Sequence, residues 1–301
     1  MPVSANRKIA GFSILCLIWG TTWLTIKIGL EGVPPFLGVG LRFVLAGSIL
    51  LVIATVRNRK LIYSRELLRI SMIIGILLFS FSYGAVYWAE QYISSGLASV
   101  LFATMPLFVA LFARFILKNE LLNPTRLLGM FIGIGGTGLI FSETVGISNL
   151  NEFRGLIVTL MSPITAAIAI VLTKKHIHRH DPFFLNGWSM LLGGSVTLSI
   201  HFAYGSPYPI VWNTVSVGAL LYLTLVGSAL AFGIYFWMLQ HTEATTVSFV
   251  TVISPVIAIF IGAGVLSESL TGLQIAGSIL VLSGVLLSEV VSKKMSNRQD
   301  L

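Results

Sequence analysis

Four residues in the first half of the chain recur in the second half at one fixed separation. The pairs, each 149 positions apart, are Trp88 and Trp237, Gln91 and Gln240, Ser99 and Ser248, and Pro106 and Pro255. Because this separation is close to half of the 301 residues, two related units are predicted, residues 1–146 and residues 147–301. Internal duplication of this kind is typical of membrane transporters whose binding site lies between the two halves.

The composition indicates that most of the surface faces lipid. Charged residues make up 10% of the chain and hydrophobic residues 55%, whereas soluble domains carry about 25% charged residues. Ten apolar runs, most of them close to the ~20 residues that a helix needs to cross a bilayer, are continuous and do not alternate as barrel strands do. The predicted fold is an all-α integral membrane protein with ten transmembrane helices. The runs are Ile9–Leu30, Phe36–Val56, Ile70–Trp88, Gly96–Leu117, Thr125–Phe141, Gly155–Thr173, Phe183–Tyr204, Thr214–Leu239, Thr246–Leu266 and Thr271–Val291.

The basic residues predict the orientation of these helices. With ten spans, 16 of the 19 Lys and Arg residues fall on one side of the membrane. The positive-inside rule assigns that side to the cytoplasm and places both termini there, in a multi-pass protein of the cell (inner) membrane. Each half then holds five spans, so the second half is inverted with respect to the first. The net charge of +8 comes from short loops between apolar runs. This distribution indicates a protein that is oriented in a membrane, so membrane lipid is the expected partner and nucleic acid is not.

Polar and aromatic residues in the first and third runs are candidates for the wall of a solute cavity. Tyr83 and Tyr87 share one helical face with Ser80 and Gln91, and polar groups that faced lipid would lack hydrogen-bond partners. In the first run, Trp19 and Thr22 are the pair expected to face inward. The alternative for the tyrosines is an aromatic belt with interhelical hydrogen bonds.

Matching stripes in the fourth and ninth runs give further candidates. The stripes contain Ser99, Phe102 and Pro106 in one run, and Ser248, Thr251 and Pro255 in the other. Each proline frees the carbonyl four residues before it and can kink its helix, so both prolines are predicted to shape the gates. A static kink packed by neighbouring helices is the alternative. Gln240, the counterpart of Gln91, is added to the predicted substrate-binding residues.

Three further features concern charge and packing. Arg42 lies inside the second run, where it either extends to the membrane interface as an anchor or captures a carboxylate. The runs hold no mid-membrane carboxylate, and Glu90 is the nearest candidate for proton coupling. Gly129 and Gly133, echoed by Gly277 and Gly284, predict close helix packing away from the solute path.

Catalytic, metal and cofactor sites are not expected. His176, His178 and His180 are two residues apart without a cysteine partner, which fits a basic loop better than a zinc site. The sequence contains neither an H-E-x-x-H motif nor a phosphate-binding G-x-x-x-x-G-K-[ST] loop. We therefore expect no enzyme and no nucleotide motor.

Several of these segments resemble the EamA-type branch of the drug/metabolite transporter superfamily. The resembling residues of the first half are Trp19-Gly20-Thr21-Thr22, Lys27, Pro34-Pro35, Arg42, Ser95-Gly96-Leu97-Ala98-Ser99, Pro106 and Glu120, and those of the second half are Ser248, Pro255, Glu268 and the stretch from Leu273 to Gly284. The resemblance implies ten helices in two inverted five-helix repeats and transport of small metabolites, often amino acids and often outward. The repeat is not chemically symmetric, because Trp19 aligns with Pro163 and Arg42 with Ser189.

Together these features predict a secondary transporter that exports amino acids or related small molecules by alternating access. A carrier of the same fold for drugs, nucleosides or cofactors is one alternative, and a passive channel is another. The sequence is compatible with a monomer.

Overall fold

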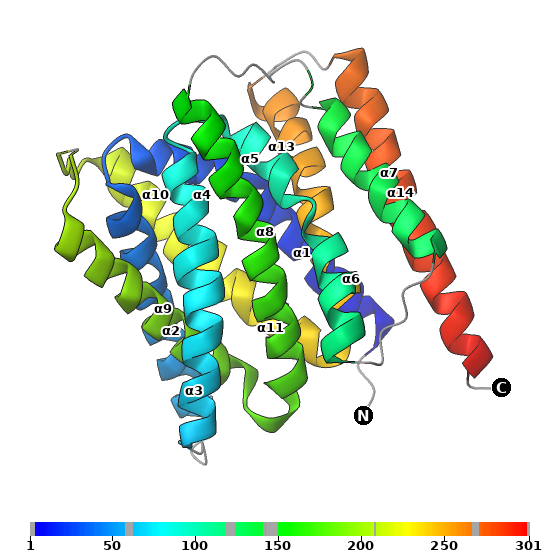
Figure 1. Cartoon of the computed structure of the whole chain (residues 1–301), viewed down its shortest axis with the longest axis horizontal. Helices are drawn as coiled ribbons and strands as arrows, with labels where there is room; N and C mark the ends of the chain where they lie inside the picture. The colour runs from blue at the N-terminus through cyan, green and yellow to red at the C-terminus, as the bar shows by residue number, and fades with distance from the viewer. Residues whose placement is uncertain are drawn as a thin grey trace.

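The protein, in its computed structural model, is a bundle of helices (Figure 1). The structure describes residues 4–57, 63–117, 124–140, 142, 150–207, 209–266 and 271–299. The helices of the first half are α1 Ala5–Leu30, α2 Pro35–Arg57, α3 Arg65–Ile74, the π-helix η1 Gly75–Ser82, α4 Tyr83–Ala89, α5 Ser95–Phe102, α6 Met105–Ile116 and α7 Pro124–Ile140.

The second half follows the same plan. Its helices are α8 Leu150–His176, the 3-10 helix η3 Ile177–Arg179, α9 Pro182–Tyr204, α10 Thr214–Thr224, the π-helix η4 Leu225–Leu230, α11 Ala231–His241, α12 Ala244–Ser248, α13 Val250–Leu266 and α14 Gly272–Gln299.

The predicted fold class is confirmed, because helices account for most of the described residues in each of the ten apolar runs. Within the described residues, seven helical segments are long and apolar enough to cross a membrane. The fifth run forms α7, which has only 17 residues, in agreement with its short apolar run. The predicted boundary at residues 146 and 147 lies outside the described residues, as do Glu120 and Glu268.

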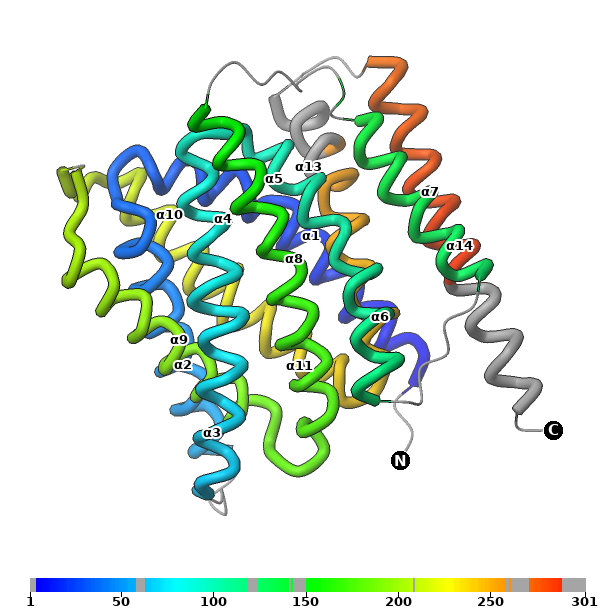
Figure 2. Tube along the Cα trace, viewed as in Figure 1, coloured from blue at the N-terminus to red at the C-terminus, as the bar shows by residue number. Residues whose placement is uncertain are grey.

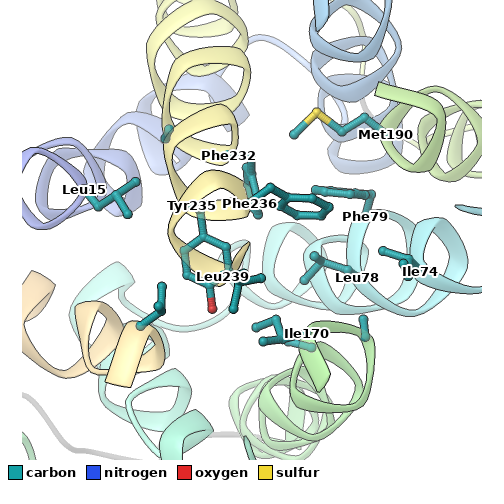
Figure 3. Packing of buried hydrophobic residues seen from close by; sticks show 14 of the residues in the cluster. Leu15, Ile74, Leu78, Phe79, Ile170, Met190, Phe232, Tyr235, Phe236 and Leu239 are labelled. Atoms are coloured by element: carbon teal, nitrogen blue, oxygen red, sulfur yellow. The ribbon is translucent and has the colours of Figure 1, made fainter. Parts of the chain in front are cut away.

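Apolar side chains cover the outside of the bundle as well as its core. Leu17 and Leu24 of α1 are 53% and 54% exposed, which suits a surface in contact with lipid. Inside, aromatic rings from both halves meet near the middle of the bundle. Figure 3 shows Phe232 and Phe236 of α11 facing Phe79 of η1, and the ring centroids of Phe79 and Phe232 are 5.0 Å apart.

Glycines bring two helix pairs into close contact, and each pair joins one half to the other. Helices α7 and α14 run side by side (Figure 1), and a Cβ atom on Gly129 would lie 2.5 Å from the Gly284 carbonyl oxygen. Helices α2 and α9 pack in the same way, where a Cβ atom on Gly47 would lie 2.7 Å from the Gly187 carbonyl oxygen. This is the small-residue packing expected of closely apposed membrane helices.

Two π-helices occupy equivalent positions in the third and eighth spans. Residues 76–81 of η1 correspond, at the repeat separation, to η4, which is Leu225–Leu230. A π-helical turn adds a residue to the helical repeat and often marks a functional segment. The segment with Ser80 therefore does not follow the regular 3.6-residue spacing assumed from the sequence. Figure 2 traces the backbone through both segments without a sharp kink.

The fourth and ninth spans are each divided in two, but at different distances from their prolines. Pro106 is the second residue of α6, and α5 ends at Phe102, shortly before it. Pro255 lies inside α13, and the division from α12 falls at Phe249. The two prolines therefore do not bend their helices equivalently, and their role in gating stays a prediction.

Candidate functional site

A cavity lies in the centre of the bundle, between the two halves. Its volume is about 40 Å³, and about 570 Å³ of space is free of atoms when its opening to solvent is included. Its wall consists of Trp19, Thr22, Trp23, Ile26, Leu78, Tyr83, Val86, Phe102 and Met105 from the first half, and Ile170, Phe232, Tyr235, Thr251 and Ser254 from the second.

The helices that form this wall come in equivalent pairs. The first, third and fourth spans of the first half contribute side chains, and so do the sixth, eighth and ninth spans. The glycine-packed helices α2, α7, α9 and α14 contribute none of the lining residues. The bundle thus has a lining layer and a bracing layer that both obey the repeat, as an inverted-repeat carrier requires.

Aromatic rings dominate one side of the cavity. The ring of Trp19 lies 5.2 Å from those of both Phe232 and Tyr235, and the ring of Phe232 lies 5.9 Å from that of Tyr83. Figure 3 shows Phe232 and Tyr235 projecting from the same helix, α11. Such a wall offers an apolar surface and ring faces to a solute.

Three hydroxyl groups of the wall are hydrogen-bonded within their own helices. Thr22 donates to the Trp19 carbonyl oxygen at 3.0 Å, Thr251 donates to the Ser248 carbonyl oxygen at 2.8 Å, and Ser254 donates to the Val250 carbonyl oxygen at 2.6 Å. Because each hydrogen is used within its own helix, each hydroxyl oxygen presents acceptor lone pairs to the cavity. The cavity therefore suits a small, largely apolar solute that carries a hydrogen-bond donor.

The structure brings together five of the nine predicted substrate-binding residues. Trp19, Thr22, Tyr83, Phe102 and Thr251 all line the cavity. Phe102 and Thr251 are equivalent at the repeat separation, so the matching stripes in the fourth and ninth runs reach the cavity from both halves. That these residues bind substrate stays a prediction.

The other four predicted residues lie away from the cavity wall. Tyr87 is buried, and its hydroxyl accepts a hydrogen bond from Arg42. Ser99 donates to the Gly96 carbonyl oxygen at 2.7 Å, and Ser248 donates to the Thr245 carbonyl oxygen at 2.6 Å. Gln240 is half-buried near the end of α11.

Several lining residues were not among the sequence candidates. Trp23, Phe232, Tyr235 and Ser254 are the clearest cases. The repeat could have indicated Phe232, because it is the counterpart of Tyr83 at the 149-residue separation. Tyr235 follows Phe232 by three positions on the same helical face.

Arg42 is fully buried and connects α2 to η4 of the other half. Its Nε donates to the Ser228 hydroxyl at 2.6 Å, and one terminal nitrogen, Nη2, donates to the Gly227 carbonyl oxygen at 3.2 Å. Its guanidinium carbon lies 5.1 Å from the centre of the Tyr83 ring, a cation–π distance. The interpretation in which Arg42 extends to the membrane interface is therefore wrong, because the side chain turns inward behind the cavity wall.

A lysine caps one helix end in each half. The Lys27 ammonium group donates to the main-chain carbonyl oxygens of Glu90 and Ile93, beyond the end of α4. The Lys174 ammonium group donates to those of Leu239, at 2.6 Å, and Thr242, at 2.7 Å. Cations are stabilised there because helix C-termini leave carbonyl groups unpaired and carry partial negative charge.

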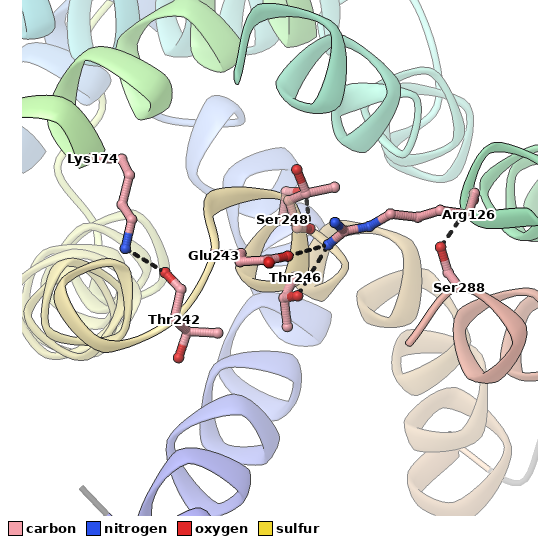
Figure 4. A network of polar contacts seen from close by, with 8 residues as sticks. Arg126, Lys174, Thr242, Glu243, Thr246, Ser248 and Ser288 are labelled. Atoms are coloured by element: carbon pink, nitrogen blue, oxygen red, sulfur yellow. Dashed lines mark hydrogen bonds and ion pairs between the residues drawn. The ribbon is translucent and has the colours of Figure 1, made fainter. Parts of the chain in front are cut away.

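Further polar contacts hold the segment between α11 and α12 (Figure 4). The buried Arg126 of α7 forms an ion pair with Glu243 at 2.9 Å and donates to the Thr246 hydroxyl at 3.2 Å. The Arg126 carbonyl oxygen accepts a hydrogen bond from Ser288 of α14 at 2.9 Å. This network ties the end of the eighth span and the start of the ninth to the bracing helices.

The EamA-like transporter family model matches the chain twice, over residues 7–142 and 153–290. The chain belongs to the EamA-like transporter family. Its fold and its membrane location are those of this family. Among the described residues, no group of three or more His, Cys, Asp or Glu side chains could hold a metal ion.

Bacterial relatives of this EamA-like chain match along most of their length. The uncharacterized transporter YoaV of Bacillus subtilis is 29% identical over 94% of this chain and 96% of the relative. The uncharacterized inner membrane transporter YedA of Escherichia coli is 31% identical over 91% of this chain and 88% of the relative. A protein of known crystal structure has the same fold, with a TM-score of 0.79, 17% identity, and coverage of 97% of this chain and 99% of the other.

Proposed function

We propose that this protein exports amino acids or related small solutes across the cell inner membrane by alternating access, with both termini in the cytoplasm. The observation that carries the proposal is the central cavity, whose wall is built from equivalent helices of the two halves. In an inverted repeat, exchanging the conformations of the two halves converts an opening on one face into an opening on the other.

The chemistry of the wall supports a small amphipathic solute. Trp19, Phe232 and Tyr235 provide ring faces for an apolar side chain, while the oxygens of Thr22 and Thr251 are placed to accept hydrogen bonds from an ammonium group. An amino acid with an apolar or aromatic side chain combines both features. The relative YedA is named an inner membrane transporter, which supports the same location here.

Counterflow in proteoliposomes tests the proposal. Vesicles loaded with unlabelled amino acids are diluted into a trace of the ¹⁴C-labelled mixture, and a carrier is expected to accumulate label transiently because inside solute exchanges with outside label. Protein-free vesicles are the control. Label that equilibrates without a transient peak and without saturation would indicate the passive channel instead.

The same assay separates the substrate classes. Individual amino acids, nucleosides and cationic drugs are loaded in turn, and the proposal expects amino acids to support counterflow. If nucleosides or cationic drugs alone support it, the protein is a carrier of the same fold with a different substrate.

A further inference from the structure

Glu90 is a fully buried acid that lies next to the cavity but is not part of its wall. It follows the last residue of α4, and its side chain is 0% exposed. Tyr83 and Val86, which line the cavity, precede it by seven and four positions. Residues with this spacing share one helical face, so Glu90 lies one turn beyond the wall, toward the membrane face where α1 ends.

The carboxyl group of Glu90 has no hydrogen-bond partner among the described residues, on either of its oxygens. The nearby cations donate to groups other than this carboxyl group. The Lys27 ammonium group donates to the main-chain carbonyl oxygens of Glu90 itself and of Ile93. Arg42 donates to Ser228, Tyr87 and Gly227. A buried carboxylate without donors is unfavourable, whereas the neutral acid tolerates such a site far better.

The other helix packed closely against α4 brings no compensating cation to this carboxyl group. Helix α8 approaches through Gly155, where an added Cβ atom would lie 3.6 Å from the Ala89 carbonyl oxygen. On the same helix, Arg154 is exposed, and Glu152 lines a separate surface recess with Gln91 and Tyr92. The groups that face Glu90 are therefore Lys27 from α1, Arg42 from α2 and the Tyr87 hydroxyl from α4.

We propose that Glu90 binds the proton that couples solute movement to the transmembrane proton gradient. The inference rests on the carrier function proposed above. When the bundle is open toward the end of α4, a proton from water adds to a carboxylate oxygen of Glu90. The neutral acid is buried when the bundle closes, and the proton returns to water through the cavity when the opposite face opens. Glu90 is then a carboxylate again, and no covalent bond to the solute forms or breaks.

This arrangement makes burial the coupling step. The ionised acid opposes closure of the empty bundle because it would enter a site without donors. Closure is permitted when either the proton or the ammonium group of a bound solute compensates the carboxylate, so the proton crosses in one direction and the solute in the other. A glutamine at this position is neutral at every pH, so the bundle can still reorient with or without solute. The Glu90→Gln variant is therefore expected to keep exchange and lose coupling.

The transport experiment compares wild type, Glu90→Gln and the control Glu31→Gln. Glu31 is an exposed acid at the end of α1, on the same face of the bundle. Each protein is assayed with the ¹⁴C-labelled amino-acid mixture, first for counterflow and then for accumulation driven by an imposed pH gradient. Wild type and Glu31→Gln are expected to show both, and Glu90→Gln only counterflow. Gradient-driven accumulation by Glu90→Gln would overturn the inference.

A second variant shows whether a loss of accumulation in Glu90→Gln comes from the missing carboxyl group or from a structural defect. Glu90→Asp keeps a titratable carboxyl group at the same place and is expected to restore accumulation. A Glu90→Asp carrier with counterflow but no accumulation would contradict the inference.

A measurement without any substrate separates the failure of this inference from that of the proposed function. Purified protein in lipid nanodiscs is titrated from acidic to alkaline pH and followed by infrared difference spectroscopy. Wild type is expected to show a protonated-carboxyl C=O band that disappears at alkaline pH and that Glu90→Gln lacks. Identical spectra from the two proteins would overturn the proton site, whereas this band without any counterflow would overturn only the choice of solute.

Discussion

Lys27 and Lys174 make equivalent contacts at opposite ends of the bundle. The acceptors of Lys27 are the carbonyl oxygens of residues 90 and 93, and those of Lys174 are the carbonyl oxygens of residues 239 and 242. Each acceptor of one lysine lies 149 positions from the corresponding acceptor of the other. In each half, a lysine of the first span is thus hydrogen-bonded to carbonyl oxygens at the end of the third span. The two sets of contacts lie at opposite faces of the membrane.

Removing either lysine is expected to loosen one face. A hydrogen bond to a charged group is worth about 1.5–3 kcal/mol. Lys174→Met should therefore raise the population of molecules that are open at the end of α11 by roughly ten-fold or more. Lys27→Met should raise the population that is open at the opposite face. The measurement is labelling of a Ser254→Cys cavity residue, in a Cys16→Ser background, by an impermeant maleimide added to one face at a time.

The exposed neighbour Lys175 provides the control for that experiment. Lys175→Met is expected to leave labelling from both faces unchanged. Equal effects of Lys27→Met and Lys174→Met on both faces would show that the lysines stabilise the bundle without controlling access.

The contact between Arg42 and Ser228 should contribute to stability. Ser228→Ala leaves the buried Nε–H of Arg42 without its 2.6 Å acceptor, which is expected to cost about 1–2 kcal/mol. Thermal unfolding in detergent measures the loss. Ser199→Ala is the matched control, because Ser199 is exposed and donates only to Ser195 of its own helix. An unchanged midpoint for Ser228→Ala would show that water or another acceptor replaces the hydroxyl.

Two glycines on α7 should respond oppositely to the same substitution. Gly129→Ala places a methyl group 2.5 Å from the Gly284 carbonyl oxygen, which forces α7 and α14 apart, whereas Gly135→Ala meets nothing within 4 Å. The first variant is expected to lower the thermal midpoint, and the second to raise stability by up to about 1 kcal/mol through helix propensity. Equal midpoints for the two variants would argue against tight α7–α14 packing.

The sequence predicts the spans well because a bilayer sets their length. Each run of ~20 apolar residues has one stable solution, a helix with its main-chain hydrogen bonds made internally. Interruptions inside a span, such as the π-helix η1 or the division at Phe249, are not predicted, because neighbouring helices satisfy the main-chain groups that they free.

The candidate site is predicted only in part, for a related reason. Spacing finds the face of a helix but does not say which neighbour that face meets. The spacing predicts Ser99 and Ser248 as cavity residues, yet neither is part of the cavity wall. Arg42 could not be placed from its sequence position, since its acceptors Gly227 and Ser228 are 185 and 186 positions away.

The central claim is that solute crosses the membrane through the cavity between the two halves. Counterflow of the ¹⁴C-labelled amino-acid mixture by Thr22→Trp and Leu24→Trp, two variants on the same helix, tests it most directly. Thr22 lines the cavity, while Leu24 is 54% exposed on the outside of the bundle. The account predicts that Thr22→Trp abolishes counterflow and that Leu24→Trp leaves it at the wild-type rate. Wild-type counterflow by a stably folded Thr22→Trp protein would contradict it.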